Sequence, residues 1–115
     1  MNHHKKTRKF GRVKKVRDAL LKSLALALFV NGKIKTTDAK ARELRPYAEK
    51  LITTGKLGTM ASHRALVARI GTIAATKIVK DIAPKYKTRK GGYTRITKLQ
   101  ARVSDGSLMA VIELI

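Results

Sequence analysis

The sequence contains no cysteine and no tryptophan, and its aromatic residues are two phenylalanines and three tyrosines in 115 residues. The absence of cysteine excludes a disulfide scaffold, a thiolate zinc site, an iron–sulfur cluster and a cysteine nucleophile. With so few aromatic residues, we expect a small core made mostly of Ala, Leu, Ile and Val. Stability must then come from aliphatic packing and from a partner.

Acidic residues are also scarce, because 7 Asp and Glu face 27 Lys and Arg, for a formal net charge of +20. A small soluble domain usually carries a net charge of magnitude about 2–8. A larger excess destabilises the compact state through self-repulsion unless a polyanion or salt neutralises it. At 43% hydrophobic residues, however, the chain is typical of a globular protein and not of a disordered basic tail. We therefore expect a folded domain that binds a polyanion.

Long apolar runs are missing as well, since the longest, Leu24 to Val30, has seven residues. Crossing a bilayer takes about 20 apolar residues. A secretory signal would need a small-residue cleavage site after the run, and Asn31-Gly32-Lys33 follows instead. We expect a complete, cytoplasmic chain with no membrane partner. The basic, acid-free N-terminus also resembles an organelle transit peptide, which leaves an organellar location open.

The cations gather in two segments without acids. Residues 1–17 hold eight Lys and Arg, and residues 85–102 hold seven. Because residues 1–12 have few apolar side chains, they are predicted to be a basic extension that is disordered alone and orders on a polyanion. Residues 13–115 are predicted to form a single globular domain, whose fold can bring the two basic segments together.

Hydrophobic spacing predicts a long first helix that begins at about Val13. Its apolar stripe has spacings of three and four residues and consists of Val13, Val16, Leu20, Leu24 and Ala27/Leu28. Asn31-Gly32 ends this helix, because both residues tolerate a positive φ.

Three further helices are predicted between residues 37 and 84. The second begins after a cap at Thr37 and stops at Gly55, with Pro46 expected to kink or split it. The third opens at Gly58-Thr59, and a fourth, short helix follows Gly71-Thr72 and ends before Pro84.

Three strands are predicted from alternating or short apolar segments, namely residues 33–37, 93–103 and 108–114. Asp105-Gly106 lies between the last two segments and is a strong hairpin signal. The order of elements indicates an α+β fold. We expect a small three-stranded mixed sheet, made of one strand after the first helix and a C-terminal hairpin, with helices packed on one face.

Catalytic and metal-binding patterns are not found in the sequence. None of the three histidines, His3, His4 and His63, has a carboxylate at ligand spacing. Acids such as Glu43 and Glu49 lie among cations, which is typical of intramolecular ion pairs. We therefore expect no enzyme activity, no catalytic residue, no metal, no cofactor and no small-molecule substrate.

The most distinctive local feature is the segment from Thr88 to Arg95. Its Gly91-Gly92 pair lets the backbone approach a phosphate, its cations supply charge, and Tyr93 supplies a ring to stack or hydrogen-bond. The segment lacks the Gly-Lys-Ser/Thr ending of a nucleotide-binding P-loop. The alternative is that the glycines merely turn the chain into the first hairpin strand.

A second candidate is the junction between the first strand and the second helix, residues 33–40. Such a junction presents free amides and a helix N-terminus to a phosphate, with help from Lys35, Thr37 and Lys40. A plain helix cap explains Thr37 equally well.

Several motifs occur in order along essentially the whole chain: Gly32-Lys33-Ile34-Lys35-Thr36-Thr37, Ala39-Lys40-Ala41-Arg42-Glu43-Leu44-Arg45-Pro46, Arg89-Lys90-Gly91-Gly92-Tyr93-Thr94-Arg95-Ile96 and Met109-Ala110-Val111-Ile112-Glu113-Leu114. In these motifs the sequence resembles the bacterial large-subunit ribosomal protein seventeen family. The resemblance implies a structural protein of the large ribosomal subunit that binds large-subunit ribosomal RNA and supports ribosome assembly and translation. It also implies a ribosome-bound location near the peptide exit region, beside other large-subunit ribosomal proteins.

Residue by residue, charge, glycine and this resemblance together indicate an RNA-facing set. The set is His3, Lys5, Lys6, Arg8, Lys9, Arg12, Lys14, Lys15, Arg17, Lys35, Thr36, Thr37, Lys40, Arg89, Lys90, Gly91, Gly92, Tyr93 and Arg95. Composition alone supports a small nucleoid-associated DNA-binding protein about equally well. Such a protein generally shows a dimerising surface or a groove-inserting arm, and the sequence has no heptad or repeat.

Overall fold

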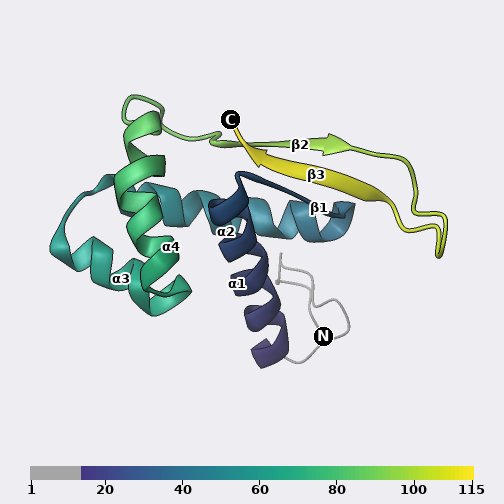
Figure 1. Cartoon of the computed structure of the whole chain (residues 1–115), viewed down its shortest axis with the longest axis horizontal. Helices are drawn as coiled ribbons and strands as arrows, with labels where there is room; N and C mark the ends of the chain where they lie inside the picture. The colour runs from purple at the N-terminus through teal and green to yellow at the C-terminus, as the bar shows by residue number, and fades with distance from the viewer. Residues whose placement is uncertain (1–13) are drawn as a thin grey trace, which may run out of the picture.

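The computed structural model of the chain describes residues 14–115 (Figure 1), so the predicted extension, residues 1–12, lies outside the described residues. Its helices are α1 (Lys14–Asn31), α2 (Asp38–Lys56), α3 (Met60–Ile70) and α4 (Thr72–Lys77). After α4 come a π-helical turn, η1 (Ile78–Ile82), and a 3-10 turn, η2 (Ala83–Tyr86). The strands are β1 (Lys33–Thr37), β2 (Thr94–Lys98) and β3 (Met109–Leu114).

The three strands form one antiparallel sheet in the order β1-β3-β2. The prediction of an α+β fold with three strands is confirmed, but the prediction of a mixed sheet is wrong. β3 returns from the hairpin between the two other strands, and both neighbours run opposite to it. β1 and β2 point the same way but are separated by β3. Within the part of the chain that the structure describes, the sheet therefore contains no parallel pair of neighbouring strands.

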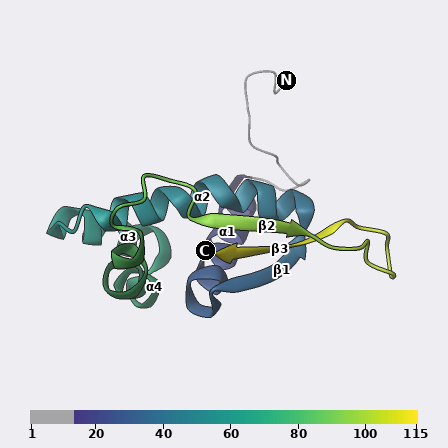
Figure 2. The same cartoon turned by 90° about the horizontal axis from the view of Figure 1, so that it is seen from above.

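The two faces of the sheet differ in chemistry. Ile34, Ile112 and Ile96 share one row of the register and pack against the hydrophobic core. α2 contacts all three strands and runs alongside the sheet on this face (Figure 2). Side chains alternate along a strand, so the neighbouring row, Lys33, Glu113 and Arg95, belongs to the face turned away from the core.

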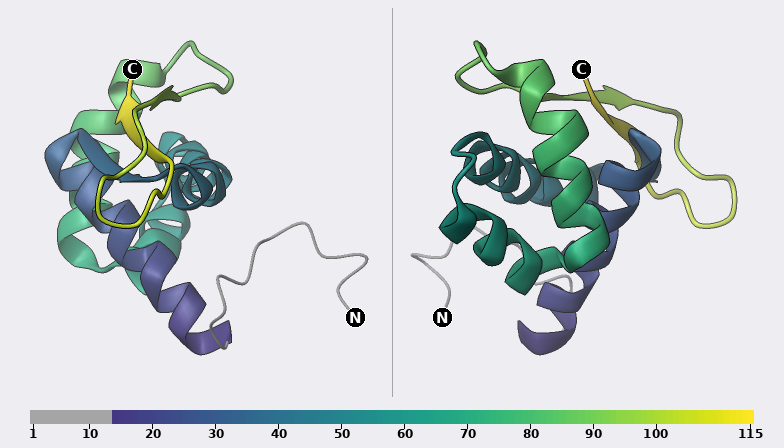
Figure 3. Two further views of the ribbon diagram at one scale, coloured as in Figure 1. Left: turned by 90° about the vertical axis from the view of Figure 1, so that its right-hand side faces the viewer. Right: turned by 60° about the vertical axis from the view of Figure 1, so that its left-hand side comes forward.

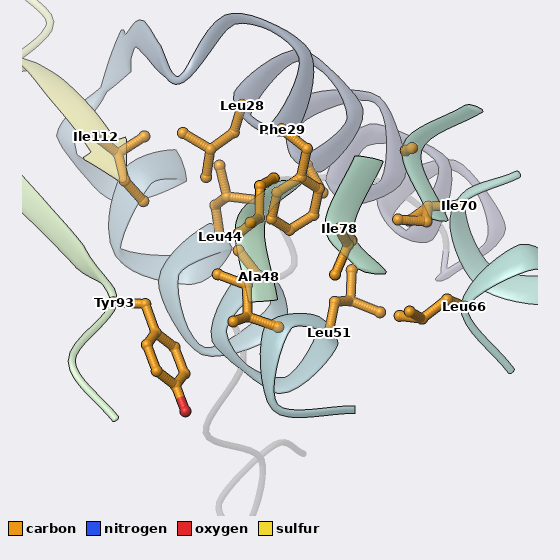
Figure 4. Close-up of a cluster of buried hydrophobic side chains, with 14 of the residues drawn as sticks. Leu28, Phe29, Leu44, Ala48, Leu51, Leu66, Ile70, Ile78, Tyr93 and Ile112 are labelled. Carbon is orange, nitrogen blue, oxygen red and sulfur yellow. The ribbon is translucent and has the colours of Figure 1, made fainter. Parts of the chain in front are cut away.

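The core joins helices and sheet around α2 (Figure 4). Its largest fully buried side chains are mostly aliphatic, as predicted, and include Phe29, Leu44, Ile52 and Ile78. At one point the packing reaches the backbone, because a Cβ at Gly55 would lie 2.5 Å from Cγ2 of Ile78. Gly55 therefore permits close contact between α2 and η1.

The buried stripe of α1 differs from the predicted one. Its buried residues are Leu21, Ala25, Leu28 and Phe29, whereas Val16 is 50% exposed. The first turns of α1 project from the rest of the molecule (Figure 3), so apolar residues there do not reach the core. The spacing of three and four residues was predicted correctly, but burial begins only at Leu21, and the buried positions 21, 25 and 28/29 each follow a predicted position, 20, 24 and 27/28, by one residue.

α2 is one continuous helix through Pro46, so of the two expected outcomes, a kink or a split, the split does not occur. α3 begins at the predicted place with a capping box between Thr59 and Ser62 and ends at Gly71, whose φ is 86°. The fourth helix ends before Pro84 as predicted, since α4 and η1 end at Lys77 and Ile82, and a separate 3-10 turn, η2, contains Pro84. Proline is tolerated there because the first residues of a helical turn need no amide hydrogen bond.

The hairpin between β2 and β3 projects from the body (Figure 1). β2 is shorter than the predicted strand 93–103, but Asp105-Gly106 lies at the hairpin tip as expected, with Gly106 at a φ of 71°. Arg102 pairs with Asp105 at 2.7 Å. The hydrogen bonds that Asp105 accepts from Arg102, and from the Ser107 amide, hold the pKa of its carboxyl well below the usual range.

Candidate nucleic-acid interface

The segment from Arg89 to Gly92, here called the basic loop, connects η2 to β2 and is exposed throughout. Gly92 has a φ of 65°, a conformation that favours glycine. Gly91 has an ordinary φ, and a Cβ there would meet nothing within 4 Å. The turn therefore explains Gly92, whereas nothing in the fold of residues 14–115 requires Gly91.

The basic loop is held in shape by contacts within the chain. The amine of Lys56, on α2, donates hydrogen bonds to the carbonyl of Arg89 and, at 3.1 Å, to the hydroxyl of Tyr93. The Arg89 amide donates to the carbonyl of Tyr86 at 3.0 Å, and the Arg89 guanidinium donates to the carbonyl of Gly92 at 3.0 Å. The loop is thus preformed by hydrogen bonds that the chain itself supplies.

Tyr93 was predicted to offer its ring for stacking, and this part of the prediction is wrong. The side chain is 1% exposed, and its ring packs on Tyr86 with a centroid separation of 5.0 Å. Its hydroxyl lies 3.4 Å from Oγ1 of Thr53. The pKa of the Tyr93 hydroxyl is lowered, chiefly by the hydrogen bond with Thr53 and to a smaller degree by the one from Lys56. Burial acts in the opposite direction and raises this pKa, but it does not outweigh the hydrogen bonds. Tyr93 therefore anchors the end of the basic loop.

At the second candidate, the junction of β1 and α2, two backbone amides already have hydrogen-bond partners within the chain. Oγ1 of Thr37 accepts a hydrogen bond from the Lys40 amide at 3.3 Å, and the Asp38 amide donates to the carbonyl of Leu108 at 2.8 Å. Asp38 also places a carboxylate in the first turn, where it pairs with Arg42 at 3.1 Å. Thr36 is only 8% exposed, so it presents little surface to a ligand. The junction is a helix cap, and its geometry offers few free amides to a phosphate.

The outward sheet face does bring two predicted residues together. Lys35 on β1 and Arg95 on β2 are exposed and share this face, although 60 positions separate them in the sequence. Arg95 pairs with Glu113 of β3 at 3.0 Å. Lys33 belongs to the same face and was missed, although its alternation with Lys35 along β1 is visible in the sequence.

The cations of α1 lie apart from the basic loop. Lys14 and Lys15 are exposed and Arg17 is half-buried in the first turns of α1. Figures 1 and 3 place this end of α1 and the loop before β2 on opposite sides of the molecule. The two basic segments of the sequence therefore do not merge into one patch within residues 14–115. The remaining predicted residues lie outside the described part: His3, Lys5, Lys6, Arg8, Lys9 and Arg12.

Two negative findings concern residues 14–115 alone. Within this range no three His, Cys, Asp or Glu side chains come together in a way that could hold a metal ion. No helix in the same range combines the length and the apolar character needed to cross a membrane.

The fold and its surface define a class: a small, strongly basic α+β protein with cations on several faces and a preformed basic loop. The family model described as ribosomal protein L17 matches residues 20–115. The chain is 51% identical over 118 residues to the large ribosomal subunit protein bL17 of Persephonella marina, covering 100% of this chain and 95% of the relative. It is 51% identical over 116 residues to bL17 of Wolinella succinogenes, covering 100% of both chains.

A relative from Campylobacter jejuni strain RM1221, also a large ribosomal subunit protein bL17, is 50% identical over 116 residues, which cover 100% of this chain and 99% of the relative. The chain therefore belongs to the ribosomal protein L17 family. The resemblance drawn from the sequence motifs is confirmed. As a member of this family the chain is a structural ribosomal protein and not an enzyme.

Proposed function

We propose that the chain is a constituent of the large ribosomal subunit that binds large-subunit ribosomal RNA mainly through phosphate contacts. The observation that carries this proposal is the exposed basic loop, which is preformed and contains a glycine that the described fold does not require. A glycine at such a point allows an RNA backbone to approach the protein backbone closely.

The distribution of ion pairs supports a phosphate-led contact. Arginines neutralise most of the acids near the basic surfaces, in the pairs Arg42–Asp38, Arg45–Glu49, Arg95–Glu113 and Arg102–Asp105. The lysines at positions 33, 35 and 90 are exposed beside these pairs. Because the acids are already neutralised, the net field over the outward sheet face and the basic loop is positive.

The proposed interface has separate parts. The first turns of α1 meet a different RNA segment from the basic loop and the outward sheet face, because this end of α1 and the loop before β2 lie on opposite sides of the molecule. Residues 1–12 act as a basic extension that inserts into RNA. We further propose that the chain lies near the peptide exit region, where other large-subunit ribosomal proteins are its neighbours, and that it supports assembly and translation.

Salt dependence tests the proposal. If the interface engages about 6–10 phosphates, affinity for large-subunit ribosomal RNA should fall by about 10³–10⁵ between 50 and 200 mM salt. Filter binding with the full chain, with duplex DNA as competitor, measures both the slope and the preference. A flat salt dependence would contradict phosphate-led binding. Equal affinity for duplex DNA would favour the DNA-binding alternative.

A further inference from the structure

A groove of about 610 Å³ lies between α2, α3 and the basic loop. Its apolar lining is Pro46, Leu51, Ala65 and Leu66. Leu51 and Leu66, labelled in Figure 4, are core residues with almost no exposed surface, so the apolar surface that is open to a ligand belongs to Pro46 and Ala65, which are both exposed. The groove is a second feature of the same surface, and of the predicted RNA-facing residues within 14–115, Lys90, Gly91 and Tyr93 line it.

Each of the three walls contributes one cation to the lining. These are Lys50 from α2, Arg69 from α3 and Lys90 from the basic loop, and all three are exposed. The acid in the lining is Glu49, whose Oε2 accepts hydrogen bonds from the Thr94 amide at 3.3 Å and the Thr94 hydroxyl at 2.9 Å. Because Glu49 is engaged within the chain, the groove presents the apolar surfaces of Pro46 and Ala65 beside a cationic rim.

We propose that this groove takes an unstacked, single-stranded nucleotide of the RNA that the chain binds. The exposed apolar surface of Pro46 and Ala65 receives the face of a base, and the cations at the rim receive the flanking phosphates. This inference rests on the proposed RNA-binding function and deepens it. A peptide is the less suitable occupant, because the walls are helices and a loop, and no strand edge among the described residues lines the groove to pair with a peptide backbone.

Filling the groove without changing charge tests the inference. Ala65 lines the groove, whereas Ala68, on the same helix and also exposed, does not. We expect Ala65→Phe to weaken binding of the full chain to large-subunit ribosomal RNA about tenfold, through loss of one bound base. Ala68→Phe, which carries the same change in helix propensity, should bind as the original chain does. Equal affinity of the two variants would overturn the inference.

A crosslinking measurement tests the same point without filling the groove. Because the sequence has no cysteine, Thr54→Cys in the lining and Ala68→Cys outside it each give a unique thiol for a photoreactive label. The Thr54→Cys conjugate should crosslink to an unpaired nucleotide that the Ala68→Cys conjugate does not reach. Crosslinks only to base-paired RNA, or to another ribosomal protein, would overturn the inference. Failure of the original chain to bind the RNA at all would instead refute the proposed function.

Discussion

Two regions meet the same sequence criteria for a phosphate site, namely the junction of β1 and α2 and the basic loop. In the structure, however, they differ in how much of their backbone is still available to a ligand. Both have cations, backbone amides and a turn. At the junction, the amides of Asp38 and Lys40 already have partners in Leu108 and Thr37. In the basic loop, Lys90 and Gly91 are exposed, and the space beside Gly91 is open.

The difference between these two regions lies in the acceptors that the chain itself supplies. A carboxylate in the first turn of a helix stabilises the helix by about 0.3–1 kcal/mol through its dipole. The same charge on Asp38 disfavours a phosphate at that place. No acid occurs between residues 85 and 102. On this ground we propose the basic loop, and not the junction, as the phosphate site.

Removing residues 1–12 should change RNA affinity more than any other variant. In the shortened chain, the junction and the basic loop can be compared without the contribution of the extension. The deletion takes away Lys5, Lys6, Arg8, Lys9 and Arg12. If each meets a phosphate, the slope of log affinity against log salt should become shallower by about 3.5–4.5. The buried core of α1 begins at Leu21, so the circular dichroism of the helices should not change. Loss of helical signal would show that the extension is part of the folded domain.

A methyl group at Gly91 tests the basic loop directly. The fold leaves room for this Cβ, so we expect Gly91→Ala to keep its stability. Its affinity for large-subunit ribosomal RNA should fall about tenfold, the effect of losing one hydrogen bond to a charged group. Filter binding and thermal unfolding measure the two effects separately.

The matched control is Gly92→Ala, which is strained because Gly92 has a φ of 65°. This variant should lose folding stability whether or not the basic loop contacts RNA. If Gly91→Ala binds as tightly as the original chain, the glycine pair serves only to turn the chain, and the basic loop loses its advantage over the junction.

Much of the fold could be predicted because local chemistry decides it. Thr37 and Thr59 cap helices, Gly71 ends one, and Asp105-Gly106 turns the hairpin, all at the predicted positions. The antiparallel sheet could not be predicted in the same way. Strand order depends on which long-range pairs bury the isoleucines best, and a periodicity of two carries no information about partners.

The candidate site was harder to predict because burial depends on tertiary packing. Tyr93 follows two glycines and precedes a strand, which is equally consistent with an exposed ring and a buried one. The ring is buried because Tyr86 and Lys56, both outside the loop, converge on it. The groove was missed for the same reason, since its lining comes from three segments that have no common sequence pattern.

Thr37→Ala tests the junction and has the smallest expected effect. Loss of the cap hydrogen bond to the Lys40 amide should lower the free energy of unfolding by about 1 kcal/mol. Affinity for large-subunit ribosomal RNA, measured below the unfolding transition, should not change, because the junction is a helix cap. A fall in affinity without a fall in stability would restore the junction as a phosphate site.

The companion variant Asp38→Asn separates charge from capping at the same place. It removes the carboxylate that pairs with Arg42, while Thr37 and its cap remain. If the junction is remote from phosphate, RNA affinity and its salt slope should both stay the same. A rise in affinity with a steeper slope would mean that a phosphate lies at this helix terminus and that Asp38 had opposed it. The junction and the basic loop would then both be phosphate sites, and they would differ only in how strongly they bind.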